Sequence, residues 1–581
     1  MSTPNDKPIR SSGVSGLSGP MRAGNPILRR MSEDMLRRAK ACEPKEERFH
    51  LGNYTFRRPD YNQILAWVRA LEMDPLQLLA VLEETSWKAE EGLLEKHILK
   101  KYIKFEVEEG SIISIAWDFE RLPILSADWE QDLRIRNFGT DGPTPTGSLL
   151  LRGDQMSLQT IDCSQSQLRT LDLQWVPNLE ILNCANNQLQ VLDIAKVNSL
   201  EFLICHDNQI KDLDLSYTPK LSTLYCDDNQ LSELDLQCVP KLKKLLCNNN
   251  QLQELDLSRI NSLELLSCSH NQIKELDIHH TPKLFLLNCP GNQLTELNLQ
   301  CIPELKRLRC YDNQLQALNL AKVNRLEDLQ CSGNQIKALD LQCVPELTNL
   351  WCENNQLQAL DLTMVNSLEF LVCDGNQIKD LDLRYTPKLS ELHCEGNQLT
   401  KLDLHCVPKL KLLHCANNRL QALDLSKINS LELLICSGNQ IKDLDLRYTP
   451  NLIYLLCEGN QLTELDLQCV PKLKKLRYHN NRIQALDLTN VNSLEELVCS
   501  GNHIKELDLQ FVPEIKKLWC DNNRLQTLDL TKASSLEVLV CSGNQIKELD
   551  LQCLPVLKEI WCDKDVQLLN CPEGLAIRRV G

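Results

Sequence analysis

Cysteine is the residue whose number and spacing most suggest chemistry in this chain of 581 residues. Of the 27 cysteines, 19 stand at position 163 and onward in steps of 21 to 562, a series broken only by Tyr478. None forms a Cys-x-x-Cys pair, the usual start of a zinc site. The regular period and the absence of a secretory signal favour reduced, buried thiols over a disulfide framework.

An aspartate in the word "LDL" forms a second regular column, and stacked carboxylates could suggest calcium. It recurs in 17 of 19 units, with Asn298 and Asn319 as the replacements. Calcium solenoids need glycine-rich turns and several oxygens per ion, whereas each unit here offers one aspartate between two leucines. We therefore expect these aspartates to accept hydrogen bonds on a solvated wall. The sequence predicts no catalytic residues, no metal site and no cofactor, and hence no enzyme.

A 21-residue period must position all of these side chains. Each unit reads L-x-x-L-x-C-x-x-N-Q-L and then x-x-L-D-L-x-x-x-P/N-x. The first half predicts a strand with alternate residues inward, and the second half predicts another extended run on the opposite wall. Cysteine should act there as a small apolar core residue. The asparagines from Asn187 to Asn544 should pair with backbone groups at a tight bend, and Ser166 and Asp565, which replace them, mark the capping units.

This repeat resembles the leucine-rich repeat family, in its short bacterial form, as in internalin-like proteins and effectors. The resemblance covers residues 150–571, about 20 units. It implies an α/β-type repeat solenoid, a curved array with a parallel β-sheet on its concave face. It also implies a protein partner, because leucine-rich repeats usually bind other proteins on that face.

The remaining segments are predicted from composition and pattern. Residues 1–27 read as a disordered tail, residues 28–140 as a small α+β domain, and residues 572–581 as a C-terminal tail. Within the small domain the pattern predicts helices between 60 and 104 and a β-hairpin around Glu109 and Gly110. The first 40 residues are basic, which suits either an export signal or an unstructured tail.

The overall charge limits the class of partner. A formal net charge of −16 argues against nucleic acid and anionic membranes as partners. No apolar stretch approaches the roughly 20 residues that span a bilayer, so membrane insertion is not expected. These features predict a cytoplasmic, reducing location, with export into a host cytosol as an alternative.

The outward strand positions are the candidate binding residues, since they vary from unit to unit while the folding columns do not. They are also unusually apolar and aromatic, as interaction surfaces are. The alternatives are that these side chains pack on one another along the strands, or that the N-terminal domain covers them. The predicted protein-binding residues are Phe202, Ile204, Tyr225, Trp351, Phe370, Val372, His393, His414, Ile435, Tyr454, Trp519 and Trp561.

The predicted function is a non-catalytic scaffold that recognises a partner protein through this face. One alternative is an effector of the bacterial ubiquitin-ligase kind, which also carries short leucine-rich repeats. That family places a catalytic domain with a Cys-x-Asp motif after the repeats, whereas 19 residues follow Cys562 here. The other alternative is an enzymatic activity in the N-terminal domain.

Overall fold

The computed structural model describes residues 159–580 in full and, before them, five strands at 48–51, 54–57, 103–108, 111–117 and 148–150. The predicted tail at 1–27 and the predicted helices between 60 and 104 lie outside the described residues. The chain divides into a part that ends at Ile260 and a part that begins at Asn261. Within the described residues no helix is long and apolar enough to cross a membrane.

The first part holds a parallel sheet in which each unit contributes one strand of three residues. Every residue pairs with the residue 21 positions later, as Leu203 does with Leu224. The register therefore equals the sequence period, and equivalent residues of consecutive units form straight columns. The strands are β6 (Thr160–Asp162), β8 (Ile181–Asn183), β9 (Phe202–Ile204), β10 (Thr223–Tyr225) and β11 (Lys244–Leu246).

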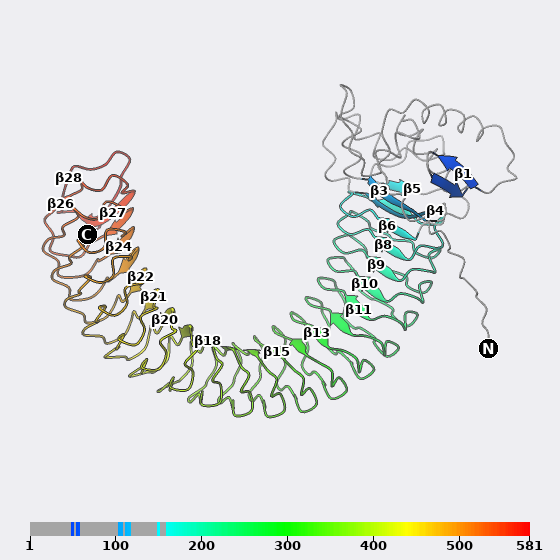
Figure 1. Ribbon diagram of the computed structural model, residues 1–581, viewed down its shortest axis with the longest axis horizontal. Helices are drawn as coiled ribbons and strands as arrows, with labels where there is room; N and C mark the ends of the chain where they lie inside the picture. Colours follow the sequence, from blue (N-terminus) through cyan, green and yellow to red (C-terminus); the bar gives the residue numbers. More distant parts are fainter. Residues whose placement is uncertain are drawn as a thin grey trace, which may run out of the picture. The chain divides into compact units, whose positions relative to one another are not determined.

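The second part repeats this arrangement over more units. Its stack bends, and the strands line the inner side of the bend (Figure 1). The parallel-sheet solenoid that the period predicts is thus confirmed. The strands are β12 (Leu265–Ser267), β13 (Leu286–Asn288), β14 (Arg307–Arg309), β15 (Asp328–Gln330), β16 (Asn349–Trp351), β17 (Phe370–Val372), β18 (Glu391–His393), β19 (Leu412–His414), β20 (Leu433–Ile435), β21 (Tyr454–Leu456), β22 (Lys475–Arg477), β23 (Glu496–Val498), β24 (Lys517–Trp519), β25 (Val538–Val540), β27 (Glu559–Asp563) and β29 (Ala576–Val580).

The predicted hairpin around Glu109 and Gly110 is confirmed. Strands β3 (Ile103–Glu108) and β4 (Ser111–Trp117) pair antiparallel, with Phe105 opposite Ile115. Strand β4 also pairs in parallel with β6, so the hairpin extends the sheet of the solenoid as well as belonging to the N-terminal region. It covers the edge that β6 would otherwise expose. Two further strands, β1 (Arg48–Leu51) and β2 (Tyr54–Arg57), form a separate antiparallel pair.

Leucine fills the core between the two walls of each unit. In the unit that contains β18, Leu392 and Cys394 point inward from the strand, and Leu399 and Leu404 point inward from the opposite wall, all 1% exposed or less. No single unit of this size encloses a core, but each is covered by the unit on either side. Burial of these and the other apolar side chains of each unit supplies the main driving force for stacking.

The opposite wall differs from the prediction in its regularity. The "LDL" halves were expected to form an extended run, yet among the described residues strands form there only at β5 (Ser148–Leu150), β7 (Thr170–Asp172), β26 (Glu548–Asp550) and β28 (Gln567–Leu569). A single isolated bridge joins Leu318 to Leu339. Along this wall the aspartate side chains bind the backbone of their own turns, both in strand β7, where Asp172 accepts from Gln174, and in units without a strand, where Asp214 accepts from Ser216.

The C-terminal segment is a further correction. Residues 572–581 were predicted to be a tail, but β29 pairs residue for residue with β27 from Glu559 opposite Ala576 to Asp563 opposite Val580. The physical reason is that the last repeat strand leaves a row of unpaired backbone groups, which the final residues satisfy. The segment is therefore a cap on the sheet.

Candidate binding face

The ladder cysteines form the floor of the sheet and take no part in its outer surface. All 19 are buried. Burial raises the pKa of Cys205 to about 12, and that of Cys268 to about 12 as well. Such thiols remain protonated and are poor nucleophiles. Their burial confirms the expectation that these thiols act as apolar core residues, and the ladder is a packing element.

The asparagine column fixes each strand to the turn of its neighbours, as predicted. The side-chain amide of Asn376 donates to the carbonyls of Cys352 and Cys373, at 3.0 and 3.1 Å, and its oxygen accepts from the backbone N–H of Leu357 at 3.0 Å. Three otherwise unpaired backbone groups from two units are satisfied by one side chain. The same pattern recurs along the column and holds the strand face rigid.

The residue before each of these asparagines takes the left-handed conformation. Asn354 has φ +54° and Gly375 has φ +61°. Only glycine, asparagine, aspartate and a few other residues adopt it at low cost, so the words "GN", "NN" and "DN" mark this turn. At Gly375 a Cβ would also lie 2.5 Å from Oδ1 of Asn354. The left-handed turn thus restricts which residue types can stand directly before each asparagine of the column.

The aspartates of "LDL" accept backbone hydrogen bonds on the outer wall, as predicted. Oδ1 of Asp214 accepts from the N–H of Ser216 at 2.9 Å, and Oδ1 of Asn298 accepts from Gln300 in the same way at 3.1 Å. Asparagine therefore replaces aspartate without loss of the bond. The carboxylates are used within their own turns, which agrees with the prediction that this column is not a calcium site.

The outward side chains of the strands are mostly half-buried. Of the twelve predicted binding residues, Phe202 and Trp561 are exposed, each at 39%, and the other ten are half-buried. The cause is contact along the sheet: Trp351 pairs with Val372, and Leu433 with Tyr454, on strands about 4.8 Å apart. The alternative that these residues pack on one another is thus partly correct, and each still exposes one edge.

The apolar strip is shorter than the sequence suggested. In the second part Arg307, Arg309 and Asp328 interrupt it at β14 and β15, and charged residues return at β22 to β24. The apolar residues are therefore concentrated from β16 to β21. We call this set the apolar patch; it contains Trp351, Phe370, Val372, Leu412, Leu433, Ile435, Tyr454 and Leu456.

Beside the apolar patch lies a basic border on β22 to β24. Arg477 donates to Oε1 of Glu496 at 2.7 Å, and Glu496 is only 6% exposed. Lys475 lies 3.9 Å from the same carboxylate, with its ammonium 5.6 Å from the ring of Tyr454. Lys517 makes no ion pair with the described residues. One carboxylate among three cations leaves this border positive.

A polar cluster lies at the centre of the apolar patch. His393 and His414 are register partners on β18 and β19, with ring centroids 5.7 Å apart. Asp374 follows β17, and ligand atoms from these three residues all lie within 4.8 Å of one another. Burial raises the pKa of Asp374 to about 6, and burial lowers the pKa of His393.

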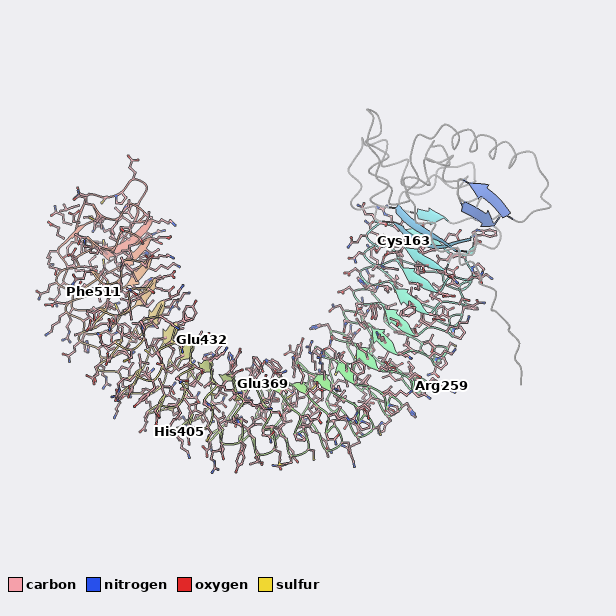
Figure 2. The ribbon with its side chains drawn as sticks, in the orientation of Figure 1. Cys163, Arg259, Glu369, His405, Glu432 and Phe511 are labelled. Atoms are coloured by element: carbon pink, nitrogen blue, oxygen red, sulfur yellow. The ribbon has the colours of Figure 1, made fainter. Side chains whose placement is uncertain are left out.

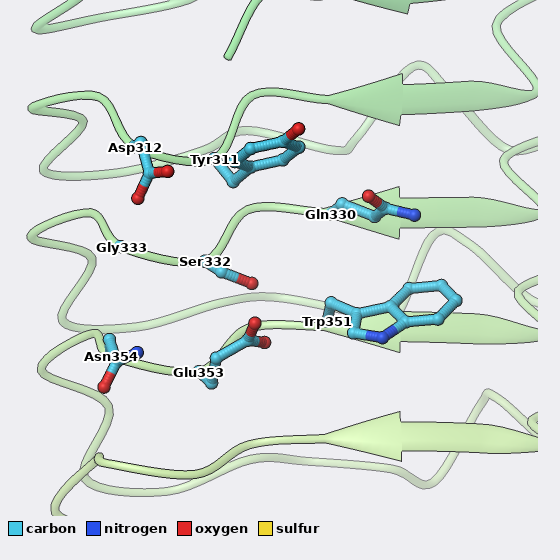
Figure 3. Close-up of a pocket in the computed structure, with 8 residues that line it drawn as sticks. All are labelled: Tyr311, Asp312, Gln330, Ser332, Gly333, Trp351, Glu353 and Asn354. Atoms are coloured by element: carbon cyan, nitrogen blue, oxygen red, sulfur yellow. The ribbon is translucent and has the colours of Figure 1, made fainter. Parts of the chain in front are cut away.

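A shallow hollow of about 280 Å³ adjoins the patch at β15 and β16. Figure 3 shows that residues from three consecutive units line it, with the ring of Trp351 and the side chain of Gln330 on one side. Oε2 of Glu353 is buried there without a hydrogen-bond partner in the described part of the chain. The hollow adds a polar recess to the apolar surface.

This architecture has counterparts among solved protein structures. No family model and no curated protein matches the chain. Among solved structures, the functional domain of InlJ from Listeria monocytogenes, described as including a cysteine ladder, is 33% identical over 55% of this chain and 74% of that one, with a TM-score of 0.52. The chain belongs to the bacterial leucine-rich repeat proteins.

Two further structures share the leucine-rich repeat fold. YopM from Yersinia enterocolitica is 28% identical over 70% of this chain and 87% of its own, with a TM-score of 0.56. The Arabidopsis receptor kinase HAESA, solved with the peptide hormone IDA and the co-receptor SERK1, covers 86% of this chain and 94% of its own at a TM-score of 0.58. At 17% identity that likeness concerns the fold alone.

The leucine-rich repeat register brings together only some of the predicted residues. Trp351, Phe370, Val372, His393, His414, Ile435 and Tyr454 lie on six consecutive strands, whereas Trp519 lies on β24 of the basic border and Trp561 lies beyond it on β27. Phe202, Ile204 and Tyr225 belong to the first part of the chain. The prediction missed Asp374. A feature of the sequence could have indicated it, because Asp374 belongs to one of three successive units in which an acidic residue directly follows the ladder cysteine.

Proposed function

We propose that this protein is a non-catalytic scaffold that binds a partner protein through the strand face of residues 261–580, centred on the apolar patch. The leucine-rich repeat solenoid is a protein-interaction fold. The observation that carries the proposal is the composition of strands β16 to β21, where variable apolar and aromatic side chains point outward from every strand but β18, although the fold requires only the leucine between them. Aromatic residues dominate interface energetics in general.

The surface also indicates the chemistry of the partner. A partner complementary to the apolar patch would present an apolar surface, and one complementary to the basic border would present acidic side chains beside it. Lys517 is the cation best placed to meet them, since Arg477 and Lys475 both lie beside the carboxylate of Glu496. Charges at the rim of an interface mainly speed association, whereas the desolvated centre supplies most of the affinity.

We also propose a reducing compartment for the protein, a cytosol of either the producing cell or a host. The support is chemical: several cysteines outside the ladder, such as Cys238 and Cys553, are exposed free thiols. Exposed thiols persist where glutathione and thioredoxin keep them reduced.

Affinity capture with two matched variants tests the binding proposal. The face variant combines Trp351→Gln, Phe370→Asn and Tyr454→Thr, and each incoming residue already stands at the same strand position in another unit, at Gln330, Asn349 and Thr223. The fold should therefore tolerate all three changes. We expect proteins captured by the wild type to be lost, which quantitative mass spectrometry would measure.

The control variant removes aromatic side chains from the outer wall. Tyr385 and Tyr448 are 40% and 44% exposed there, at the repeat position that Phe511 occupies in Figure 2. Replacing both by alanine should leave the captured proteins unchanged. If the control variant loses the same proteins as the face variant, or the face variant loses none, the strand face is not the binding site.

A further inference from the structure

Three potential metal ligands converge on the strand face from three consecutive units. His393 and His414 project from neighbouring strands in register, and Asp374 reaches them from the end of β17. One ligand atom from each residue lies within 4.8 Å of the other two, and all three residues are half-buried. Two ligand atoms each about 2.1 Å from one metal lie at most about 4.2 Å apart, so small rotamer changes would bring these three donors to the spacing of a single site.

We propose that Asp374, His393 and His414 bind one divalent transition-metal ion of the zinc class. Two imidazoles and one carboxylate are a borderline donor set, which suits Zn²⁺ and its neighbours. Mg²⁺ and Ca²⁺ instead prefer oxygen-only sites. Three protein ligands would leave at least one coordination position open to water or to another ligand.

The surrounding groups orient the ligands as the second shell of a metal site does. Oε2 of Glu395 lies 2.9 Å from Nε2 of His414, and Oε1 of Glu395 accepts from Nδ2 of Asn417 at 2.8 Å. The backbone N–H of Glu395 donates to Oδ1 of Asp374 at 2.5 Å. One residue thus holds both a histidine and the carboxylate, and a carboxylate behind a ligating histidine is a common feature of metal sites.

The local charge also favours a cation. Glu353, Asp374 and Glu395 are three acidic residues in successive units directly after the ladder cysteine, and all three are half-buried. Oε2 of Glu353 has no hydrogen-bond partner among the described residues. Buried carboxylates without enough partners are costly, and a divalent ion beside them offsets that cost.

The repeats themselves argue that this cluster is not required by the fold. The strand position of His393 and His414 is taken by Val372 in the unit before and by Ile435 in the unit after. The same column contains no other histidine anywhere in the array. Three units further along, the positions of Asp374 and His393 hold Ser437 and Leu456, so the set is not repeated there.

Calorimetric titration of the full chain with Zn²⁺ tests the site, after the exposed thiols have been alkylated so that they do not compete. We expect one tightly bound ion per chain. His393→Val and His414→Ile place the neighbouring units' own residues at these positions, and each should weaken binding by roughly tenfold or more. Asp374→Asn is isosteric and should weaken it similarly, while Glu395→Gln should cost less because its contact is indirect.

A histidine and carboxylate pair on the outer wall provides the control. His405 lies 2.9 Å from Asp403 and 3.4 Å from Asp424, on the side of the stack away from the strands (Figure 2). His405→Ala should leave the affinity unchanged. The proposal is overturned if the cluster variants bind Zn²⁺ as tightly as the wild type, if His405→Ala alone abolishes binding, or if Mg²⁺ competes at equal concentration. Zinc binding can fail while partner capture persists, so the two proposals are tested separately.

Discussion

The side-chain amide of Asn376 donates a 3.0 Å hydrogen bond to the carbonyl of Cys352, which precedes it by 24 residues. The bond joins two units through a group that neither could satisfy alone. The same bond recurs along the column. The asparagine side chains, more than the cysteine side chains beside them, therefore join neighbouring units by hydrogen bonds.

We expect Asn376→Ala to destabilise the solenoid by roughly 2–4 kcal/mol, because buried backbone groups at Leu357 and in the cysteine column lose their partner. Asn544→Ala should cost less, since Asn544 is only half-buried near the end of the stack. Urea denaturation of both variants would measure this difference. Equal losses would mean that burial does not set the cost.

Thiol reactivity should separate the two kinds of cysteine. At pH 8 in the native state, iodoacetamide should label only cysteines outside the ladder, because burial raises the pKa of Cys205 to about 12 and keeps its thiol protonated. Raising the pH to 9 should speed labelling of exposed thiols and leave the ladder unlabelled. Peptide mass spectrometry would show this, with all 27 cysteines labelled after denaturation. Native labelling of Cys205 at the rate of Cys238 would contradict it.

Tyr478 should be more stabilising than the cysteine that the repeat would place there. Its side chain is fully buried in the ladder position. Tyr478→Cys restores the repeat pattern but leaves a cavity, and we expect a loss of about 2–4 kcal/mol. Tyr478→Phe keeps the ring and should change the free energy of unfolding by less than about 1 kcal/mol. A neutral Tyr478→Cys would show that the neighbouring units close around the smaller side chain.

Two arginine–aspartate pairs stand at equivalent positions of different repeats on the outer wall, and we expect the carboxyl groups of both to have the same lowered pKa. Nε of Arg384 donates to Asp382 at 2.9 Å and lowers the pKa of that carboxyl to about 2, and Arg447 does the same for Asp445. Because the folded pKa lies below the unfolded value of about 3.9, the stabilisation is present above pH 4 and is lost as the pH falls towards 2.

Carbon-13 NMR of the aspartate carboxyl groups would measure both copies in one titration. In Arg384→Gln the Asp382 midpoint should rise towards its ordinary value, while Asp445 stays low as an internal control. A midpoint of Asp382 that does not move would show that the backbone N–H of residue 384 alone sets this pKa.

Much of this fold was predictable because one period controls it. The spacing of leucine, cysteine and asparagine determined the strand, the bend and the parallel register, and the hairpin around Gly110 followed from alternation alone. The opposite wall was harder, because the same "LDL" word stands in units that pair there and in units that do not, so periodicity does not reveal where strands form.

The candidate site was predictable only in part. His393 and His414 were identified as outward residues, but a metal site requires Asp374, which lies at another repeat position and meets them only through the stacking of three units. The depth of burial of Trp351 or Tyr454 likewise depends on the side chains of adjacent strands. Whether a terminal segment pairs with the sheet, as β29 does, depends on which strand edge the repeats leave unpaired.

The 21-residue hydrogen-bond register has a mechanical consequence. When the chain is pulled from its C-terminus, each unit can be stripped from the stack without disturbing those beyond its neighbour, because its contacts are local. Extension should therefore proceed in equal steps of about 70 Å, the contour length of 21 residues at roughly 3.4 Å each. Under load the molecule would therefore lengthen step by step, one repeat at a time, and would not unfold in a single event.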